Sequence, residues 1–144
     1  PIPLLARKDF NAVLREVTTL YEPLLENKGI ALVFEPAPHA VLLPVDVQQI
    51  EQVLINILKN AQEACQTGQR IEVQLDASSL RIRNNGEPIP PEAEHLLFTP
   101  FYSNKTEGQG IGLTLIRDIL LNHGWKFSLR TGEDGWTEFK IWWG

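Results

Sequence analysis

Two pairs of short segments with strand periodicity constrain the fold of this chain most strongly. In 70–76 (RIEVQLD) and 79–84 (SLRIRN), apolar and polar residues alternate, which is typical of adjacent strands in a hairpin. The segments WKFSLRTG (125–132) and WTEFKIWW (136–143) alternate in the same way around EDG and predict a closing hairpin. Both hairpins therefore predict a sheet with one apolar face for helices to cover.

Three segments have the apolar spacing of helices: 10–28, about 46–65, and roughly 110–123. Asp9 can cap the first, and Pro23 predicts a kink or an early end within it. We expect a strand at 30–35, a connector with a short strand at 36–44, and a functional loop at 85–109, which is long for a connection. This order predicts an α/β two-layer sandwich: a mixed sheet with helices on one face.

Composition narrows the class of protein. The hydrophobic fraction of 43% is ordinary for a globular protein, and 144 residues is the size of one domain. The net charge of −5 argues against a protein that wraps around nucleic acid. Cys65 is the only cysteine, which excludes an internal disulfide and fits a reducing compartment. We expect residues 1–144 to be one domain cut from a longer protein.

Three alternating glycines precede the third predicted helix, in SNKTEGQGIGL (103–113). A helix start has unpaired backbone N–H groups and the positive end of the helix dipole, and glycine lets a phosphate approach them. Gly108, Gly110 and Gly112 therefore fit a phosphate cradle, and Lys105 could add a positive charge. A flexible loop that leads into a helix has the same pattern, so this segment alone is weak support.

The second predicted helix carries two asparagines on one face. Asn56 and Asn60 are four residues apart, in a polar stripe beside the apolar one. A polar face on a helix is ordinarily explained by exposure to solvent. Asparagine is a poor helix former, however, so two of them in mid-helix favour a functional role. An amide oxygen is a good ligand for Mg²⁺, and the same Mg²⁺ ion can also bind phosphate oxygens.

Strand phase directs two more polar side chains toward the apolar side of the sheet. Asn84 is in phase with Leu80 and Ile82, and Thr137 is in phase with Phe139. Buried polar groups need partners. A structural partner or the edge of a purine base inserted between sheet and helices would satisfy both.

Four motifs in this order resemble the catalytic, ATP-binding domain of sensor histidine kinases, in the superfamily shared with MutL and type II topoisomerase ATPases. QVLINILKNAQEA (52–64) resembles the N box, and IRNNGEPIPPE (82–92) the first glycine box. LLFTPFYSNKTEGQGIGL (96–113) resembles the F box, lid and second glycine box, and GWTEFKIWW (135–143) the closing strand. The resemblance covers the whole chain and is greatest to nitrogen-regulation kinases.

The resemblance implies a role for each matching residue. Asn60 would ligate Mg²⁺, and Asn56 would support the phosphates. Asn84 would meet the adenine amino group, with Gly86 giving the base room and Thr137 completing the contact through water. The lid anchors, the phosphate-binding residues and one further nucleotide contact are expected at Phe98, Phe101, Lys105, Thr106, Gly108, Gln109, Gly110, Ile111, Gly112, Leu113 and Ile89.

The same resemblance implies the activity, with Asn56, Asn60 and Lys105 as the catalytic residues. The γ-phosphate of ATP would pass, with Mg²⁺, to a histidine on a separate helical dimerisation domain, and then to a response regulator. This transfer depends on positioning and charge neutralisation. We expect no nucleic-acid partner and no membrane contact by this domain. ATP supply and the lone cysteine predict a cytoplasmic location, also compatible with a membrane-anchored parent protein.

Asn56 distinguishes between branches of the superfamily. The ATP-hydrolysing branches carry a glutamate there as general base, and an amide cannot accept that proton. This favours a kinase, with Glu63 as a weak candidate for a substitute base. His39, His95 and His123 lack the sequence context of a phosphorylated histidine, so we expect the acceptor to lie in another domain and the isolated chain to be unable to label itself.

The first glycine box departs from the usual Asp-x-Gly-x-Gly, because Asn84 replaces the aspartate and Pro88 a glycine. Asn84 keeps an acceptor oxygen but loses the charge, and Pro88 lacks an N–H. Both changes fall in the expected adenine pocket, and neither touches the phosphate side. They motivate one alternative, a degenerate module with a regulatory or interaction role. A second alternative is a serine kinase of the anti-sigma-factor type, which uses the same fold.

Replacing Asn84 by aspartate is expected to strengthen ADP binding. A carboxylate would accept a charge-assisted hydrogen bond from the adenine amine, which is roughly twice as strong as a neutral one, so we expect a gain of about fivefold or more. Calorimetric titration of both proteins with ADP measures this. Unchanged or weaker binding by Asn84→Asp would contradict it.

Overall fold

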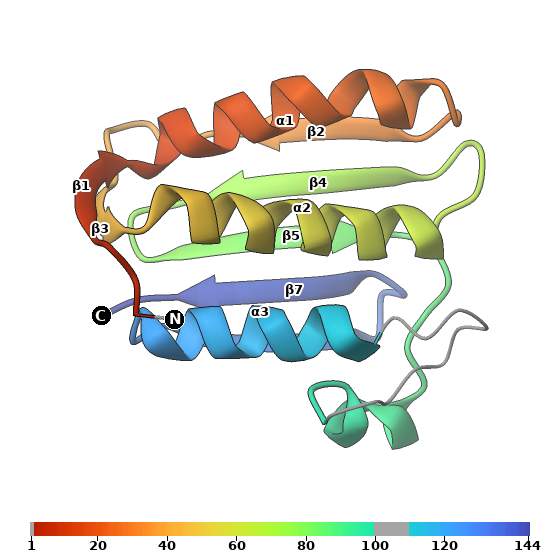
Figure 1. Cartoon of the computed structure of the whole chain (residues 1–144). Helices are drawn as coiled ribbons and strands as arrows, with labels where there is room; N and C mark the ends of the chain where they lie inside the picture. The colour runs from red at the N-terminus through yellow and green to blue at the C-terminus, as the bar shows by residue number, and fades with distance from the viewer. Residues whose placement is uncertain (1, 100–109) are drawn as a thin grey trace.

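The computed structural model describes residues 2–99 and 110–144, which form the predicted α/β two-layer sandwich (Figure 1). Three long helices cover one face of a five-stranded sheet. The elements in chain order are β1 (Ala6–Asp9), α1 (Phe10–Glu26), β2 (Ala31–Glu35), β3 (Leu42–Val45), α2 (Val47–Ala64), β4 (Arg70–Leu75), β5 (Ser79–Asn84), the 3₁₀ helix η1 (Pro91–Leu96), α3 (Gly110–Asn122), β6 (Lys126–Thr131) and β7 (Thr137–Trp142).

The sheet is mixed, as the sequence predicts. Its strand order is β2-β4-β5-β7-β6, in which β2 runs parallel to β4 and the other neighbours are antiparallel. Both predicted hairpins are present, as β4–β5 and β6–β7. The strands β1 and β3 form a separate antiparallel pair. The sequence does not predict β1, because its residues are largely exposed and show no apolar alternation.

The core lies between the helices and the sheet. The apolar residues of β4, β5 and β7 point toward the helices, and the predicted apolar stripe of α2 is buried against them. The fully buried side chains include Leu54 and Leu58 of α2, Ile71 of β4, Leu80 of β5 and Ile141 of β7. Removing this apolar area from water supplies the main driving force for folding.

Aromatic contacts join the first helix to the last hairpin. The ring of Phe10 lies edge-on to Trp125 and Trp143, at centroid distances of 5.8 Å and 5.5 Å. Trp125 and Trp143 are themselves 5.3 Å apart. Edge-on aromatic pairs add to the free energy of burial, so this cluster ties the two ends of the chain together.

His123 connects the end of α3 to the start of α2. Its Nε2 accepts a hydrogen bond from the backbone N–H of Asp46 at 3.1 Å, and its Nδ1 lies 2.9 Å from the carbonyl oxygen of Ile119. Because Nε2 accepts, the proton of the neutral ring is on Nδ1 and is donated to Ile119. The backbone N–H groups of Leu4 and then Gln49 hold the pKa of the Asp46 carboxyl below its ordinary value.

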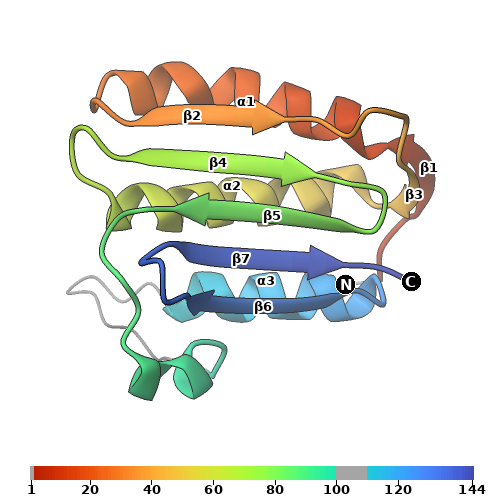
Figure 2. The ribbon, with the colours of Figure 1, turned by 180° about the vertical axis from the view of Figure 1, so that it is seen from behind.

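No described helix covers the opposite face of the sheet (Figure 2). This face carries charged side chains instead. The guanidinium of Arg83 lies 3.3 Å from the carboxylate of Glu72, 3.5 Å from Glu138 and 3.2 Å from Asp134. It also stacks over the ring of Trp136, 4.9 Å from the centroid. Antiparallel strands can keep one face solvated in this way, with opposite charges paired across strands.

The helix boundaries follow the sequence with small differences. The side chain of Asp9 accepts a hydrogen bond from the backbone N–H of Asn11 and so caps α1, as predicted. The helix continues through Pro23 and ends at Glu26, two residues before the predicted boundary. The predicted loop after β5 contains η1. In the described part of the chain, no helix combines the length and the apolar character needed to cross a membrane.

Replacing Phe10 by alanine is expected to destabilise the fold by about 3–5 kcal/mol, because it removes a buried ring and two edge-on contacts. Phe10 is 1% exposed, whereas Leu20 of the same helix is 68% exposed and serves as the control. Urea unfolding of Leu20→Ala should differ from the wild type by no more than about 0.5 kcal/mol. Equal losses in the two variants would contradict the assigned core.

Candidate functional site

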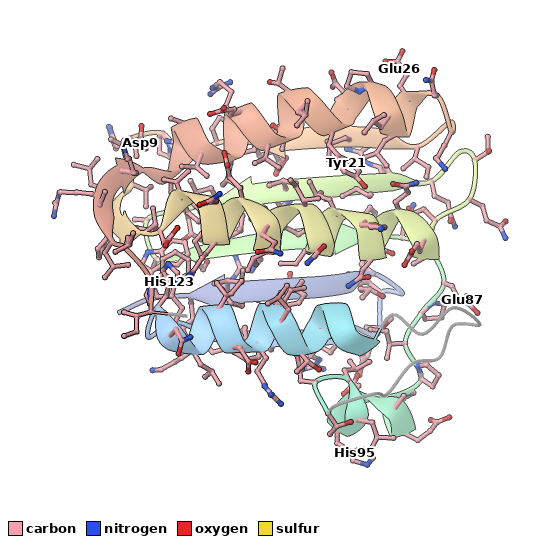
Figure 3. All side chains as sticks on the ribbon, in the orientation of Figure 1. Asp9, Tyr21, Glu26, Glu87, His95 and His123 are labelled. Carbon is pink, nitrogen blue, oxygen red and sulfur yellow. The ribbon has the colours of Figure 1, made fainter. Side chains whose placement is uncertain are left out.

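The predicted site residues that the structure describes gather at one end of the molecule (Figure 1). There α2 ends, α3 begins, β5 and β6 end, and β7 begins, with η1 alongside. Figure 3 shows Glu87 at this end and His123 at the opposite one. The topology thus brings together segments that are far apart in sequence.

Asn84 and Thr137 face each other on adjacent strands. They are direct partners in the β5–β7 register and are 6% and 5% exposed, which confirms the phase argument. The Oδ1 of Asn84 accepts a hydrogen bond from the backbone N–H of Gly86 at 3.0 Å. This bond identifies the oxygen and nitrogen of the amide, because an N–H needs an acceptor. The Nδ2 group has no protein partner among the described residues.

Thr131 is a residue of this site that the sequence analysis missed. Its Oγ1 lies 2.6 Å from the Oγ1 of Thr137, its register partner on β7, and either hydroxyl can be the donor. The same Oγ1 accepts a hydrogen bond from the backbone N–H of Ile89 at 2.8 Å. Thr131 therefore holds the loop after β5 against the last hairpin. Its strand phase with Phe127 and Leu129 was the signal that could have revealed it.

Gly86 lies where no side chain would fit. A Cβ at this position would come within 2.3 Å of the carbonyl oxygen of Ala64, at the end of α2. That carbonyl accepts a hydrogen bond from the N–H of Glu87 at 2.8 Å. The glycine is thus required by the approach to α2, whatever space a ligand needs.

The loop around Pro88 is anchored on both sides. Glu87 donates its N–H to Ala64, and Ile89 donates its N–H to Thr131. Pro88, which lies between them, is exposed, so neither hydrogen bond depends on the N–H that proline lacks. Burial raises the pKa of the neighbouring Cys65 thiol, and a hydrogen bond from the N–H of Gly86 partly opposes this.

Asn56 and Asn60 lie on α2 with half-buried side chains. Gln62 marks the side of α2 that faces α1, since its Oε1 accepts a hydrogen bond from the hydroxyl of Tyr21 at 3.0 Å. Two residues correspond to about 200° around a helix, so Asn60 lies on the side that faces α3. Neither asparagine amide has a hydrogen-bond partner within residues 2–99 and 110–144.

Phe98 packs beside the sheet just after η1. Its ring lies edge-on to Phe127 and Phe139, at centroid distances of 5.0 Å and 5.9 Å. Its carbonyl oxygen accepts a hydrogen bond from the guanidinium of Arg117 in α3, at 2.9 Å. Arg117 is a second residue that the sequence analysis missed, and it ties α3 to the segment before the predicted lid.

The remaining predicted residues divide into two groups. Gly110, Ile111 and Gly112 lie in the first turn of α3, and Leu113 is half-buried against the core. A helix start supplies unpaired backbone N–H groups, which suits an anion. Outside the described residues lie Phe101, Lys105, Thr106, Gly108 and Gln109.

The arrangement offers distinct chemical groups at one end of a helix-covered sheet. A buried amide and a pair of hydroxyls can hydrogen-bond to a planar heterocycle, and carboxamides on α2 can supply hard oxygen ligands. The described residues contain no cluster of three or more histidine, cysteine or acidic side chains suited to a metal.

Comparison with known proteins gives a family and several relatives. The family described as "Histidine kinase-, DNA gyrase B-, and HSP90-like ATPase" matches residues 45–144. The sensor protein TdiS of Thauera aromatica is 36% identical over an alignment of 120 residues, with 76% of this chain and 22% of TdiS covered. The sensory histidine kinase/phosphatase NtrB of Salmonella typhimurium is 31% identical over an alignment of 128 residues, with 78% of this chain and 36% of NtrB covered. The chain thus spans well under half the length of these relatives.

Solved structures share the fold over nearly the whole chain. The nucleotide-free catalytic domain of the histidine kinase ThkA superposes with a TM-score of 0.83 at 30% identity, covering 95% of this chain and 93% of that domain. ThkA in complex with the response regulator protein TrrA matches with a TM-score of 0.76 at 28% identity, covering 95% of this chain and 40% of the ThkA chain.

Replacing Thr131 by valine is expected to release the loop after β5. Valine has nearly the same shape but no hydroxyl, so the Ile89 N–H loses its acceptor, at a cost of about 1–3 kcal/mol where the group stays out of water. Hydrogen exchange at the Ile89 amide should become faster in Thr131→Val and stay close to wild type in Thr131→Ser. Unchanged exchange in the valine variant would contradict this contact.

Proposed function

The chain belongs to the family of histidine kinase-, DNA gyrase B- and HSP90-like ATPases, and on this premise we propose that it donates the γ-phosphate of ATP to a histidine on a separate domain. Its relatives include sensor histidine kinases, so it is an ATP-binding kinase domain. We further propose that residues 1–144 form one such domain. The observation that carries the proposal is the buried pair Asn84 and Thr137, which are direct partners on adjacent strands.

The buried pair is suited to recognise the base. Asn84 and Thr137 are polar side chains in an otherwise apolar layer, and Asn84 has an amide nitrogen with no protein partner in the described residues. Burying such groups costs free energy unless a hydrogen bond compensates it. A purine inserted between sheet and helices would supply the missing partner for the amide.

The α2 asparagines are suited to the metal and the phosphates. Asn60 would hold Mg²⁺ through its amide oxygen, and Asn56, one turn earlier on the same face, would support the phosphates. Mg²⁺ would bridge phosphate oxygens and neutralise their charge.

The start of α3 would receive the phosphates. The backbone of Gly110, Ile111 and Gly112 lies in its first turn, where N–H groups lack helical partners. Lys105, Thr106, Gly108 and Gln109 would complete the cradle, and Phe98, Phe101 and Leu113 would anchor the segment around it. Ile89, held by Thr131, would border the base.

Transfer is favoured over hydrolysis by the chemistry of Asn56. A carboxamide cannot take a proton from water, so this position offers no general base. Glu63 is exposed on the same helix and is the weaker candidate for that role. The protein would act by positioning ATP for a histidine acceptor, and we propose that it has no self-labelling activity without that acceptor.

The remaining partners are proposals as well. A histidine-bearing dimerisation domain would receive the phosphate, and a response regulator would take it next. ThkA has been solved with the response regulator TrrA, which supports a partner of this class. We propose a cytoplasmic setting, where ATP is supplied, and no contact of this domain with nucleic acid or membrane.

Calorimetric titration with ADP, with and without Mg²⁺, tests the proposal. We expect saturable binding that Mg²⁺ strengthens. Asn60→Ala should lose about tenfold or more in the presence of Mg²⁺, because it removes a contact to a charged group. Gln52→Ala is the matched control, since Gln52 is exposed on the same helix and should bind ADP like the wild type.

Two results would count against the proposal. Absence of ADP binding at millimolar concentration by a folded sample would favour the degenerate interaction module. Equal Mg²⁺ dependence in Asn60→Ala and the wild type would remove Asn60 from the metal site. Phosphate transfer to a serine of a partner protein would instead favour the anti-sigma-factor type of kinase.

A further inference from the structure

The orientation of the Asn84 amide determines which groups it can offer to a base. Its Oδ1 is engaged by the Gly86 N–H at 3.0 Å, which leaves Nδ2 as the part of the amide with no protein partner among the described residues. Within those residues, the one side-chain polar atom that is both sealed from solvent and unpartnered is Oε1 of Gln49. The Nδ2 group of Asn84 is not among such atoms, and the residue as a whole is 6% exposed.

An amide and a carboxylate recognise different purines. Adenine carries an amino group at C6, which is a donor, beside the acceptor N1. Guanine and hypoxanthine carry a carbonyl oxygen at C6, which is an acceptor, beside a protonated N1. A carboxylate offers acceptors alone, so it matches the amino group and repels the carbonyl. The amide of Asn84 offers N–H donors as well as the second lone pair of Oδ1.

The threonine pair beside Asn84 adds no fixed polarity. The hydroxyls of Thr131 and Thr137 are 2.6 Å apart, and either one can be the donor. When Thr131 donates, the proton of Thr137 is free for a ligand. When Thr137 donates, it presents lone pairs. The group opposite Asn84 in the register can therefore serve as donor or acceptor to a base.

We propose that this site accepts 6-oxopurine nucleotides about as readily as adenine nucleotides. The inference rests on the proposed function, since it concerns the base in the same pocket. The Nδ2 group of Asn84 donates to the C6 carbonyl oxygen of inosine or guanosine nucleotides. With adenine, the same group donates to a ring nitrogen while Oδ1 accepts from the amino group, a pairing that asparagine makes readily.

Parallel titrations with ADP and IDP test this inference. These two nucleotides differ at the C6 substituent and the protonation of N1, so their affinity ratio isolates this contact. We expect the dissociation constants of the wild type for ADP and IDP to lie within about fivefold of each other, which is the worth of one ordinary hydrogen bond. Asn84→Asp should shift the ratio toward ADP by about tenfold or more.

Asn85→Asp is the matched control. It makes the same chemical change one residue later, where the side-chain oxygen accepts the backbone N–H of Arg70 at 2.8 Å, which an aspartate can also do. Its ratio of ADP to IDP affinity should equal that of the wild type. Thermal unfolding checks that both variants are folded. The ratio of ADP to IDP affinity in the wild type tests the inference even if a variant does not fold.

The outcomes separate this inference from the proposed function. If the wild type binds ADP and rejects IDP as strongly as Asn84→Asp does, the relaxed base preference is wrong and the ATP-binding function stands. If an equal shift appears in Asn85→Asp, added charge and not base recognition explains it, and the inference also fails. If the folded wild type binds neither nucleotide, both proposals fail together.

Discussion

Two polar side chains placed inside an apolar layer are the constraint on which this site depends. Asn84 and Thr137 pair directly across β5 and β7 on the face that the helices cover. Because unpartnered buried polar groups are costly, their surroundings must supply hydrogen bonds. The N–H of Gly86 and the hydroxyl of Thr131 do so, and each also positions a segment of the loop after β5.

The two faces of the sheet are stabilised by different interactions. Three helices cover one face, where branched and aromatic residues are buried, and leave the other face uncovered (Figure 2). The uncovered face carries a network of ion pairs centred on Arg83. Exposed ion pairs stabilise little individually, but this network includes side chains that are largely shielded from water. The sheet thus stays ordered without a second helical layer, and Asn84 and Thr137, the proposed base contacts, lie on the covered side.

Much of this fold could be predicted from periodicity. Strand phase alone identified Asn84 and Thr137 as pointing under the helices, because a strand alternates with period two whatever its neighbours are. Phase could not reveal that the two are direct partners, since register depends on how separate hairpins align. The strand β1 escaped prediction because its residues are held by pairing with β3 and not by burial.

The site was predicted less completely than the fold, for a physical reason. Arg117 acts through the backbone carbonyl of Phe98, and a backbone partner cannot be identified from residue types. Strand phase points Thr131 to the same side as Phe127 and Leu129, but phase does not reveal its bonds to Thr137 and to the backbone of Ile89. Gly86 was expected for the space of a base, whereas the structure shows that the Ala64 carbonyl already requires it. The match to the family and its relatives identifies the chain as an ATPase-family domain, which the geometry alone does not do.

The carbonyl of Ala64 has a consequence for communication within the molecule. Ala64 is the last residue of α2, the helix that bears Asn56 and Asn60. Its carbonyl oxygen accepts the hydrogen bond from the N–H of Glu87 and lies against Gly86. The helix proposed to hold the metal and the loop proposed to border the base therefore meet at the Ala64 carbonyl. A force applied to α2 by a docked domain would reach this loop through that peptide group as well as through the packing of α2 on β5, and by thermodynamic linkage a ligand held by the loop would act back on α2.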